Sequence, residues 1–247
     1  MPVRVIPNDH FVEIQPIRFK TDTLFANVIP PLPAKTFFMA LVGKPASGKS
    51  TTMSTLLSKK PNKDGFGFYR KQFDNVYFIM PKNSLENMPD SHPYHKHIKA
   101  EPDSYFDSLN AVTLTEILEK AKADALEGER SLLVIDDEVA ALKRPEVIAL
   151  LQEIAANRRH YALSVCVLTQ VWNTIPLVVR KMLSHAFVWR ASPREFDAIY
   201  DEAFFSLTKP QAKELCEHAW KEDHGFIFID LSENRFFDKS LHELVTC

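Results

Sequence analysis

The sequence predicts an α/β fold with a mostly parallel sheet, and three features lead to this prediction. Short, wholly apolar runs of strand length alternate with segments of helical character. These runs lack the polar–apolar alternation of a half-exposed strand, so we expect strands buried on both faces. The chain has 247 residues, 45% hydrophobic and 25% charged, which is ordinary for a soluble globular protein with a sizeable core.

Five buried strands are expected in order along the chain. Their ranges are residues 37–42, 76–80, 132–135, 163–168 and 186–189. A first helix is expected over Lys49–Ser58, and later helices are marked by their capping residues. One helix is expected to open with a capping box at Thr113 and Glu116 and to stop at Gly128, and the next to have Pro145 in its first turn and to end near Asn157. Two more are expected to begin at a cap of Ser192 with Glu195 and at Thr208. Residues 226–230 and 234–237 favour a terminal hairpin.

The chain divides into three parts by composition. Residues 1–34 are predicted to be an N-terminal arm, because seven of the sixteen prolines fall within the first 45 residues, with an edge strand around residues 11–20. Residues 35–190 are predicted to form the core, and residues 191–247 a small C-terminal extension of helices and hairpin packed on it. Residues 81–102, rich in Pro and His, are predicted to be a surface excursion.

The charge and cysteine counts exclude several classes of protein. Thirty basic and 32 acidic residues give a net charge of −2, so no overall positive field attracts a polyanion. Three widely spaced cysteines form neither a CxxC pair nor a disulfide framework, which suits a reducing interior. The apolar runs are too short for a membrane span, and the first ten residues lack a signal peptide's apolar region. We therefore expect a cytosolic or nuclear type of protein.

A phosphate-binding loop follows the first strand. The stretch GKPASGKS fits the pattern GxxxxGK[ST], and it holds two of only six glycines in the chain. Lys49 is expected to reach the β- and γ-phosphates of ATP, and Ser50 to supply a ligand to Mg²⁺. The predicted nucleotide-binding residues are Gly43, Lys44, Pro45, Ala46, Ser47, Gly48, Lys49, Ser50 and Thr51.

Three carboxylates follow the third strand, and an amide follows the fourth. Asp136 is expected to bind Mg²⁺ together with Ser50, because ligands bind at the carboxyl ends of strands in such sheets. Asp137 is the first choice for the base that activates water, and Glu138 is the second. Gln170 is predicted to contact the γ-phosphate or the attacking water, a role that Thr169 could share.

Arginines near the fourth strand are candidates for neutralising transition-state charge from a neighbouring subunit. Arg158, Arg159 and Arg180 are the candidates, and a solvated helix end is an equal alternative. The cluster from His92 to Lys99 is interpreted first as a surface loop, second as a DNA-contacting loop and third as a metal site. Cys166 is expected in the core.

These motifs together resemble a known family. The order strand–GKPASGKS–helix, then LLVIDDE, then NRRHYALSVCVLTQVWNTIP is similar to the FtsK–HerA superfamily, and within it to the poxvirus-type genome-packaging ATPases. The resemblance covers about residues 35–190. It implies a five-stranded RecA/FtsK-like core in which the phosphate-loop and Walker B strands flank the strand that bears the glutamine. It also implies a hexameric or pentameric ring that hydrolyses ATP and threads double-stranded DNA into a preformed capsid.

The resemblance carries over to individual residues. Lys49 and Ser50 correspond to Walker A, Asp136 and Asp137 to Walker B, and Gln170 to the sensor. In the FtsK branch an arginine follows the TQ pair, whereas this chain has Val171, which leaves Arg158 and Arg159 as the preferred arginine-finger candidates. The implied partners are double-stranded DNA and a capsid or portal-vertex protein, at sites of virion assembly in the host cytoplasm or nucleus.

Two other functions remain open from the residues. A P-loop kinase acting on a small molecule or a polynucleotide end would be a monomer or dimer, but it needs no water-activating acid beside the metal. A nucleotide-binding structural switch would bind ATP without turnover. A GTPase is disfavoured, because no NKxD motif follows the acidic strand.

Overall fold

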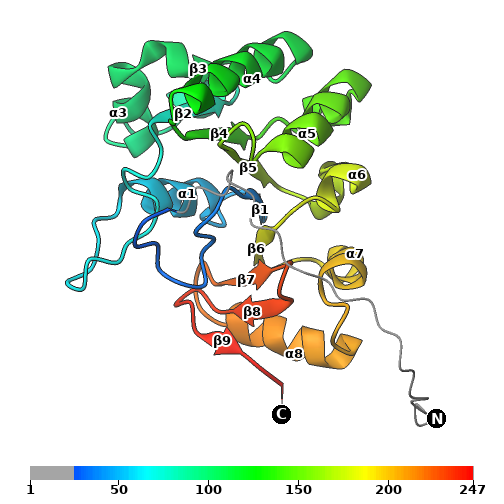
Figure 1. Cartoon of the computed structure of the whole chain (residues 1–247). Helices are drawn as coiled ribbons and strands as arrows, with labels where there is room; N and C mark the ends of the chain where they lie inside the picture. Colours follow the sequence, from blue (N-terminus) through cyan, green and yellow to red (C-terminus); the bar gives the residue numbers. More distant parts are fainter. Residues whose placement is uncertain (1–24, 247) are drawn as a thin grey trace, which may run out of the picture.

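The computed structural model describes residues 25–246, and these form one mixed sheet covered by helices on both faces (Figure 1). The strands are β1 Phe38–Val42, β2 Asn75–Ile79, β3 Tyr105–Phe106, β4 Ser131–Asp136, β5 Leu163–Thr169, β6 His185–Trp189, β7 Phe226–Asp230, β8 Arg235–Phe237 and β9 Glu243–Leu244. All five expected strands and both strands of the terminal hairpin are confirmed, with small changes at their ends.

The helices follow the expected pattern over most of the chain. The α-helices are α1 Lys49–Ser58, α2 Lys82–Glu86, α3 Pro93–Ala100, α4 Ala111–Leu126, α5 Pro145–Asn157, α6 Leu177–Arg180, α7 Pro193–Ala203 and α8 Lys209–Ala219. Short 3₁₀ turns are η1 Pro102–Ser104, η2 Ala141–Lys143 and η3 Trp172–Thr174. As expected, Ser192 caps α7 by accepting from the Glu195 N–H, and α8 begins after Thr208. Thr208 also forms a capping box with Gln211.

The strand order is β3-β2-β4-β5-β1-β6-β7-β8-β9. Strands from β3 to β6 run parallel, and β7, β8 and β9 continue the sheet in antiparallel pairs. β5 therefore lies between β4 and β1, the arrangement that the resemblance implied. The fold class is confirmed, and the expected five strands are the centre of a sheet of nine within residues 25–246.

Two expectations about local structure are wrong. Helix α4 begins two residues before Thr113, because the Asn110 side chain accepts the Thr113 N–H at 3.0 Å and acts as the N-cap. The segment around the histidines is a helix, α3, with His92 as its N-cap and Tyr94 fully buried beneath it. Residues 81–102 are therefore a folded helical insertion whose aromatic side chain anchors it to the sheet.

Each face of the sheet has its own apolar core. In β1, Phe38, Ala40 and Val42 face one core, while Phe37, just before the strand, and Met39 face the other, all fully buried. Helices α4, α5, α6, α7 and α8 cover the first face. Helices α1 and α3 and residues 25–37 cover the second. This two-sided burial explains why the strands are apolar throughout.

Some expectations concern residues that the structure does not describe or boundaries that it does not test. The edge strand around residues 11–20 lies outside the described residues. The division into arm, core and extension stays a prediction. Between residues 25 and 246, no helix is long and apolar enough to cross a membrane.

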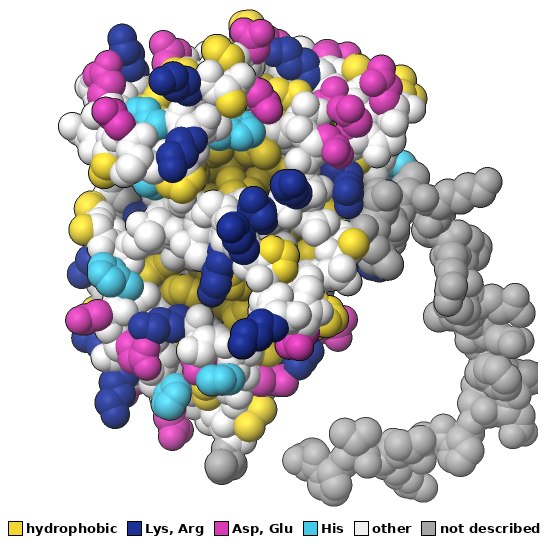
Figure 2. All heavy atoms as spheres, turned by 90° about the vertical axis from the view of Figure 1, so that its left-hand side faces the viewer, with side chains coloured by type: hydrophobic (Ala, Val, Ile, Leu, Met, Phe, Trp, Pro, Cys, Tyr) yellow, Lys and Arg dark blue, Asp and Glu magenta, His cyan; other side chains and the backbone are white. Residues whose placement is uncertain are grey.

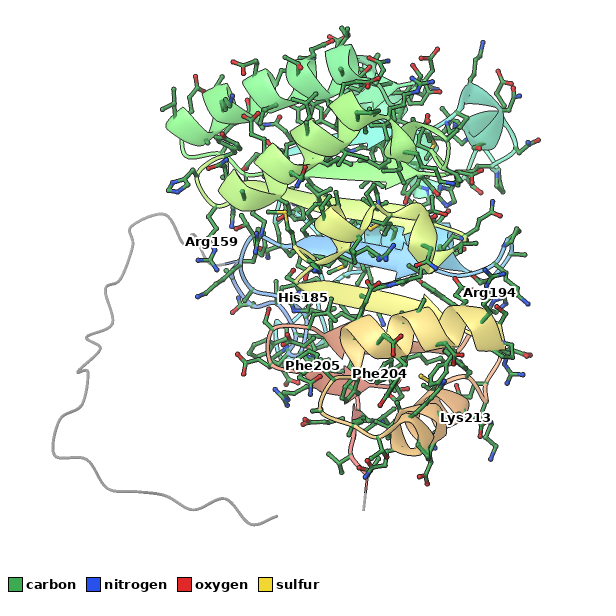
Figure 3. The ribbon with its side chains drawn as sticks, turned by 90° about the vertical axis from the view of Figure 1, so that its right-hand side faces the viewer. Arg159, His185, Arg194, Phe204, Phe205 and Lys213 are labelled. Carbon is green, nitrogen blue, oxygen red and sulfur yellow. The ribbon has the colours of Figure 1, made fainter. Side chains whose placement is uncertain are left out.

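His185 is a buried histidine at the start of β6 (Figure 3). Its ring stacks on Phe228 with centroids 5.6 Å apart, and its Nδ1 lies 2.9 Å from the Ser184 hydroxyl. Burial lowers the pKa of His185 to about 4, although the nearby Asp230 carboxylate opposes this shift. Since the unfolded chain binds the proton more readily, His185 costs stability as pH falls from about 6.5 towards 4.

This burial predicts a pH-dependent stability. Between pH 7.5 and pH 5 the wild-type chain should lose about 2 kcal/mol of unfolding free energy through this one group. His185→Gln removes the titrating ring and should remove most of that loss, measured by urea unfolding at both pH values. His160→Gln, at an exposed position, is the matched control and should lose as much as wild type. Equal pH dependence in all three proteins would contradict the prediction.

Candidate functional site

The phosphate loop connects β1 to α1 at the edge where the parallel strands end. Ala46 has φ 61° and Gly48 has φ 105°, so the chain turns tightly before the helix. Gly48 is the N-cap of α1, and no side chain from residues 25–246 caps that end. A β-carbon at Gly43 would lie 2.7 Å from Ser47 Oγ and 2.8 Å from Trp189 Cβ. The Gly43 N–H donates to the Thr169 carbonyl at 3.1 Å and the Ser47 N–H to the Lys44 carbonyl at 3.2 Å. The N–H groups at the start of α1 are therefore the ones expected to bind an anion.

Lys49, the first residue of α1, folds back over the loop. Its Nζ donates to the carbonyl oxygens of Gly43 at 2.6 Å and Lys44 at 3.1 Å. Burial lowers the pKa of Lys49, while the charges of Asp136 and Asp137 oppose this shift. The ammonium group therefore lies in the field of two carboxylates, beside the turn that fits a phosphate.

Ser50 joins the loop to the acidic end of β4. Its hydroxyl donates to Asp136 Oδ2 at 2.8 Å. Asp136 is buried, and this desolvation raises its pKa to about 6 against the effects of Ser50 and Lys49. A buried carboxylate beside a hydroxyl is an oxygen donor pair of the kind that Mg²⁺ binds.

Asp137 and Gln170 meet at the ends of neighbouring strands. Gln170 Nε2 donates to Asp137 Oδ1 at 3.1 Å. Asp137 has φ 61°, a left-handed conformation that is uncommon outside glycine, and its side chain is exposed. Next to Gln170, the Thr169 hydroxyl is buried and has no hydrogen-bond partner among the described residues.

Glu138 is held in a different environment. Partial burial raises the pKa of Glu138. The hydrogen bond that it accepts from the backbone of Leu109 and the positive charge of Arg144 oppose this shift. Its carboxylate therefore faces the connection before α4, whereas Asp137 contacts Gln170. This difference favours Asp137 over Glu138 as the base, and the assignment stays a prediction.

The structure does not bring Arg158 and Arg159 to the phosphate loop of their own chain. They lie between α5 and β5, at the edge where the strands begin, and Arg158 donates to the Ala155 carbonyl at 2.6 Å. Arg194 is in the first turn of α7, which follows the carboxyl end of β6. In Figure 3, Arg159 and Arg194 lie towards opposite edges of the molecule. Either Arg158 or Arg159 would have to act on the site of another subunit.

Arg180 has a structural partner. Its guanidinium group donates to both carboxylate oxygens of Glu202, at 2.7 and 2.6 Å, and to the Ile175 carbonyl at 2.6 Å. Glu202 also accepts from Trp172 Nε1 at 3.1 Å. The pair ties α6 and η3 to α7, so the structure argues against Arg180 as the arginine that acts in trans.

The three histidines of the His92–Lys99 segment make separate contacts. His92 accepts the Tyr94 N–H, His95 lies 3.3 Å from the Met88 carbonyl, and His97 lies 3.1 Å from the Val76 carbonyl. Among residues 25–246, no group of three or more His, Cys, Asp or Glu side chains could hold a metal ion. The cluster stabilises the insertion around α3.

Two residues outside the predicted set border the phosphate loop. His224 Nδ1 lies 3.2 Å from the Ser47 carbonyl, and the His224 carbonyl accepts from Trp189 Nε1 at 3.2 Å. The position of Trp189 at the carboxyl end of a strand is a signal that could have been used. His224 has no such signal, because its place depends on the antiparallel pairing of β7 with β6.

The family of the chain is shown by its sequence. The profile of the family described as poxvirus A32 protein matches residues 28–214. The chain belongs to that family. The matched range contains the phosphate loop, the acidic strand end and Gln170, and His224 lies beyond it. No curated protein matches the sequence significantly.

Solved structures of viral packaging proteins share the fold. B204, the DNA-packaging ATPase of Sulfolobus turreted icosahedral virus, is 18% identical, with a TM-score of 0.59 over 85% of this chain and 98% of that one. The genome-packaging NTPase B204 of Sulfolobus turreted icosahedral virus 2, in complex with ATP-gammaS, is 16% identical, with a TM-score of 0.54 over 82% and 96%. The same NTPase with AMPPCP is 15% identical, with a TM-score of 0.54 over 85% and 98%.

The pair Arg180–Glu202 predicts a stability defect. Arg180→Ala leaves a partly buried carboxylate without its cation and should lower the unfolding free energy by about 3 kcal/mol. Adding Glu202→Gln should cost less than the sum of the single changes, in a cycle measured by urea unfolding. Arg194→Ala, at the exposed start of α7, is the control and should change stability by less than about 0.5 kcal/mol. An unchanged Arg180→Ala protein would contradict this role.

Proposed function

We propose that the protein is an Mg²⁺-dependent ATPase that moves double-stranded DNA and packages a viral genome. The observation that carries the proposal is the meeting of Ser50, Asp136, Asp137 and Gln170 at one edge of the sheet, beside an intact phosphate loop. A kinase needs no carboxylate beside its metal ligand to activate water, whereas a hydrolase does. Membership of the poxvirus A32 family, and the shared fold with viral packaging proteins, support this choice.

Each residue has a defined part in the proposed reaction. The turn at Gly43–Gly48 binds the phosphates through its N–H groups, and Lys49 contributes positive charge there. Ser50 and Asp136 would hold Mg²⁺, which would neutralise phosphate charge when bound. Asp137 takes the proton of the attacking water, and Gln170 orients Asp137 and the water.

The proposal includes a ring of identical subunits. Among residues 25–246, neither Arg158 nor Arg159 lies beside the phosphate loop of its own chain, because both precede β5 at the opposite edge of the sheet. An arginine from a neighbouring chain would complete it. Ring size, a capsid or portal-vertex partner, and action at sites of virion assembly in the host cytoplasm or nucleus belong to the same proposal.

A basic segment after α1 supports DNA as the partner. Residues 59–71 contain five basic side chains and one acidic side chain, and Phe66 is 43% exposed among them. The basic side chains are Lys59, Lys60, Lys63, Arg70 and Lys71. Figure 2, which faces α1 and this segment, shows Lys and Arg gathered in a band across the middle of the face. In a chain of net charge −2, this local excess suits contact with phosphates.

The ATPase can be tested directly. The purified assembly should hydrolyse ATP in the presence of Mg²⁺, and double-stranded DNA should raise the rate at low salt. Lys49→Ala and Asp137→Asn should each lower kcat by about a hundredfold or more. Glu138→Gln is the matched control and should retain most activity. Lack of DNA stimulation would contradict the translocase, and full activity of Asp137→Asn would move the base elsewhere.

The basic segment gives a separate prediction. Changing Lys59, Lys60 and Lys63 to Ala should reduce DNA stimulation and lower the slope of log affinity against log salt by about 2 to 3. The rate without DNA should stay unchanged, since these exposed residues lie beyond the end of α1. Changing Lys120, Lys122 and Lys143 to Ala removes the same charge elsewhere. Equal effects of the two triple variants would mean that only net charge matters.

A further inference from the structure

The site fixes the direction in which a bound nucleotide extends. Asp136, Asp137 and Gln170, which face the terminal phosphate in the proposed function, belong to the ends of β4 and β5. These strands lie on one side of β1, and β6 lies on the other. A nucleotide whose last phosphate points to β4 and β5 therefore extends its nucleoside over the end of β6.

A cavity lies at that place. It has a volume of about 460 Å³ and opens beside the phosphate loop. Residues 44–47 form one wall, and the opposite wall is formed by Trp189, Arg190 and the turn of residues 220–225 between α8 and β7. The C-terminal part of the chain, which carries no recognised motif, thus borders the nucleotide site.

Hydrogen bonds hold this opposite wall in shape. Trp220 Nε1 donates to the Val188 carbonyl at 2.9 Å, and Arg190 donates to the Trp220 carbonyl at 3.0 Å. His224 links the turn to Ser47 and Trp189 through the contacts described above. A β-carbon at Gly225 would lie 2.4 Å from the Ala219 carbonyl oxygen, so the tight turn requires glycine. The wall is built before any ligand binds.

The side chains of the wall match a nucleoside. The indole of Trp220 and the guanidinium group of Arg190 are planar and stack on aromatic bases. Glu222 and Asp223 border the same cavity, and carboxylates accept hydrogen bonds from ribose hydroxyls. We propose that Arg190, Trp220 and residues 221–225 bind the base and ribose of ATP. This inference rests on the proposed function, whose phosphate site sets the position of the nucleoside.

A larger cavity nearby is a poorer fit. It has a volume of about 790 Å³ between α7 and α8, shares Arg190 and Trp220, and has Phe196 and Lys213 among its lining residues. No phosphate-loop residue lines it. Figure 3 shows Lys213 on α8, well below the blue strand β1, which leads into the phosphate loop. A base placed there would contact no residue of the phosphate loop.

The test compares two ligands on the full chain by calorimetry. One is a methylene-bridged ATP analogue with Mg²⁺, and the other is Mg²⁺ tripolyphosphate, which has the phosphates but no nucleoside. Arg190→Ala and Trp220→Ala should each weaken the analogue about tenfold. Both should bind tripolyphosphate as wild type does. Trp220→Phe retains a stacking ring and should stay within about threefold for the analogue.

Control variants make each outcome decisive. Lys213→Ala, which lines only the larger cavity, should bind both ligands normally, and Lys49→Ala should lose both. Unchanged analogue affinity in Arg190→Ala, which alters an exposed side chain, would overturn the inference. An equal loss of affinity for both ligands in Arg190→Ala and Trp220→Ala would also overturn it. So would a loss of analogue affinity that occurs in Lys213→Ala alone. If the unaltered chain bound neither ligand, the proposed ATPase would fall, and this wall with it.

Discussion

The hydrogen bond from Ser50 to Asp136 links two segments that are 86 residues apart in sequence. It forms because β1 and β4 both run parallel to β5 and lie on either side of it, so that their carboxyl ends lie at one edge. The same parallel order places Thr169 and Gln170 between the loop and the acidic residues. Every proposed step of ATP hydrolysis depends on this order, because no single segment of the chain carries the whole set of groups.

Burial of charge is the cost of this arrangement. Asp136 loses most of its water contact at the end of β4, and desolvation raises its pKa although Ser50 and Lys49 oppose the change. Lys49 is shifted in the opposite direction by the same cause. Two groups whose charged forms are disfavoured by burial gain most from a ligand of complementary charge. The unfavourable desolvation of these two charged groups is therefore concentrated where phosphates and a cation would bind.

The central sheet could be predicted from sequence because its strands are buried on both faces, which makes them apolar throughout. The edges of the sheet could not. β3 and β9 have two residues each, too few for any periodic pattern. The start of α4 was misplaced because Thr113 and Glu116 match a capping box, while Asn110 is the better-placed acceptor. Helix α3 could not be predicted because its histidines are polar and Tyr94 is its only buried residue, which leaves no periodic apolar pattern.

The candidate site also has a part that could be predicted from the sequence and a part that could not. The residues from Gly43 to Ser50, and those from Asp136 to Glu138, are contiguous, so the chemistry of each group can be judged from its spacing. Trp189, Arg190, Trp220 and His224 are brought together only when β7 pairs antiparallel with β6 and returns the turn after α8 to the phosphate loop. Local patterns do not encode that return. The antiparallel continuation of the parallel sheet therefore places residues 220–225 beside the phosphate loop, where we propose that they bind the nucleoside.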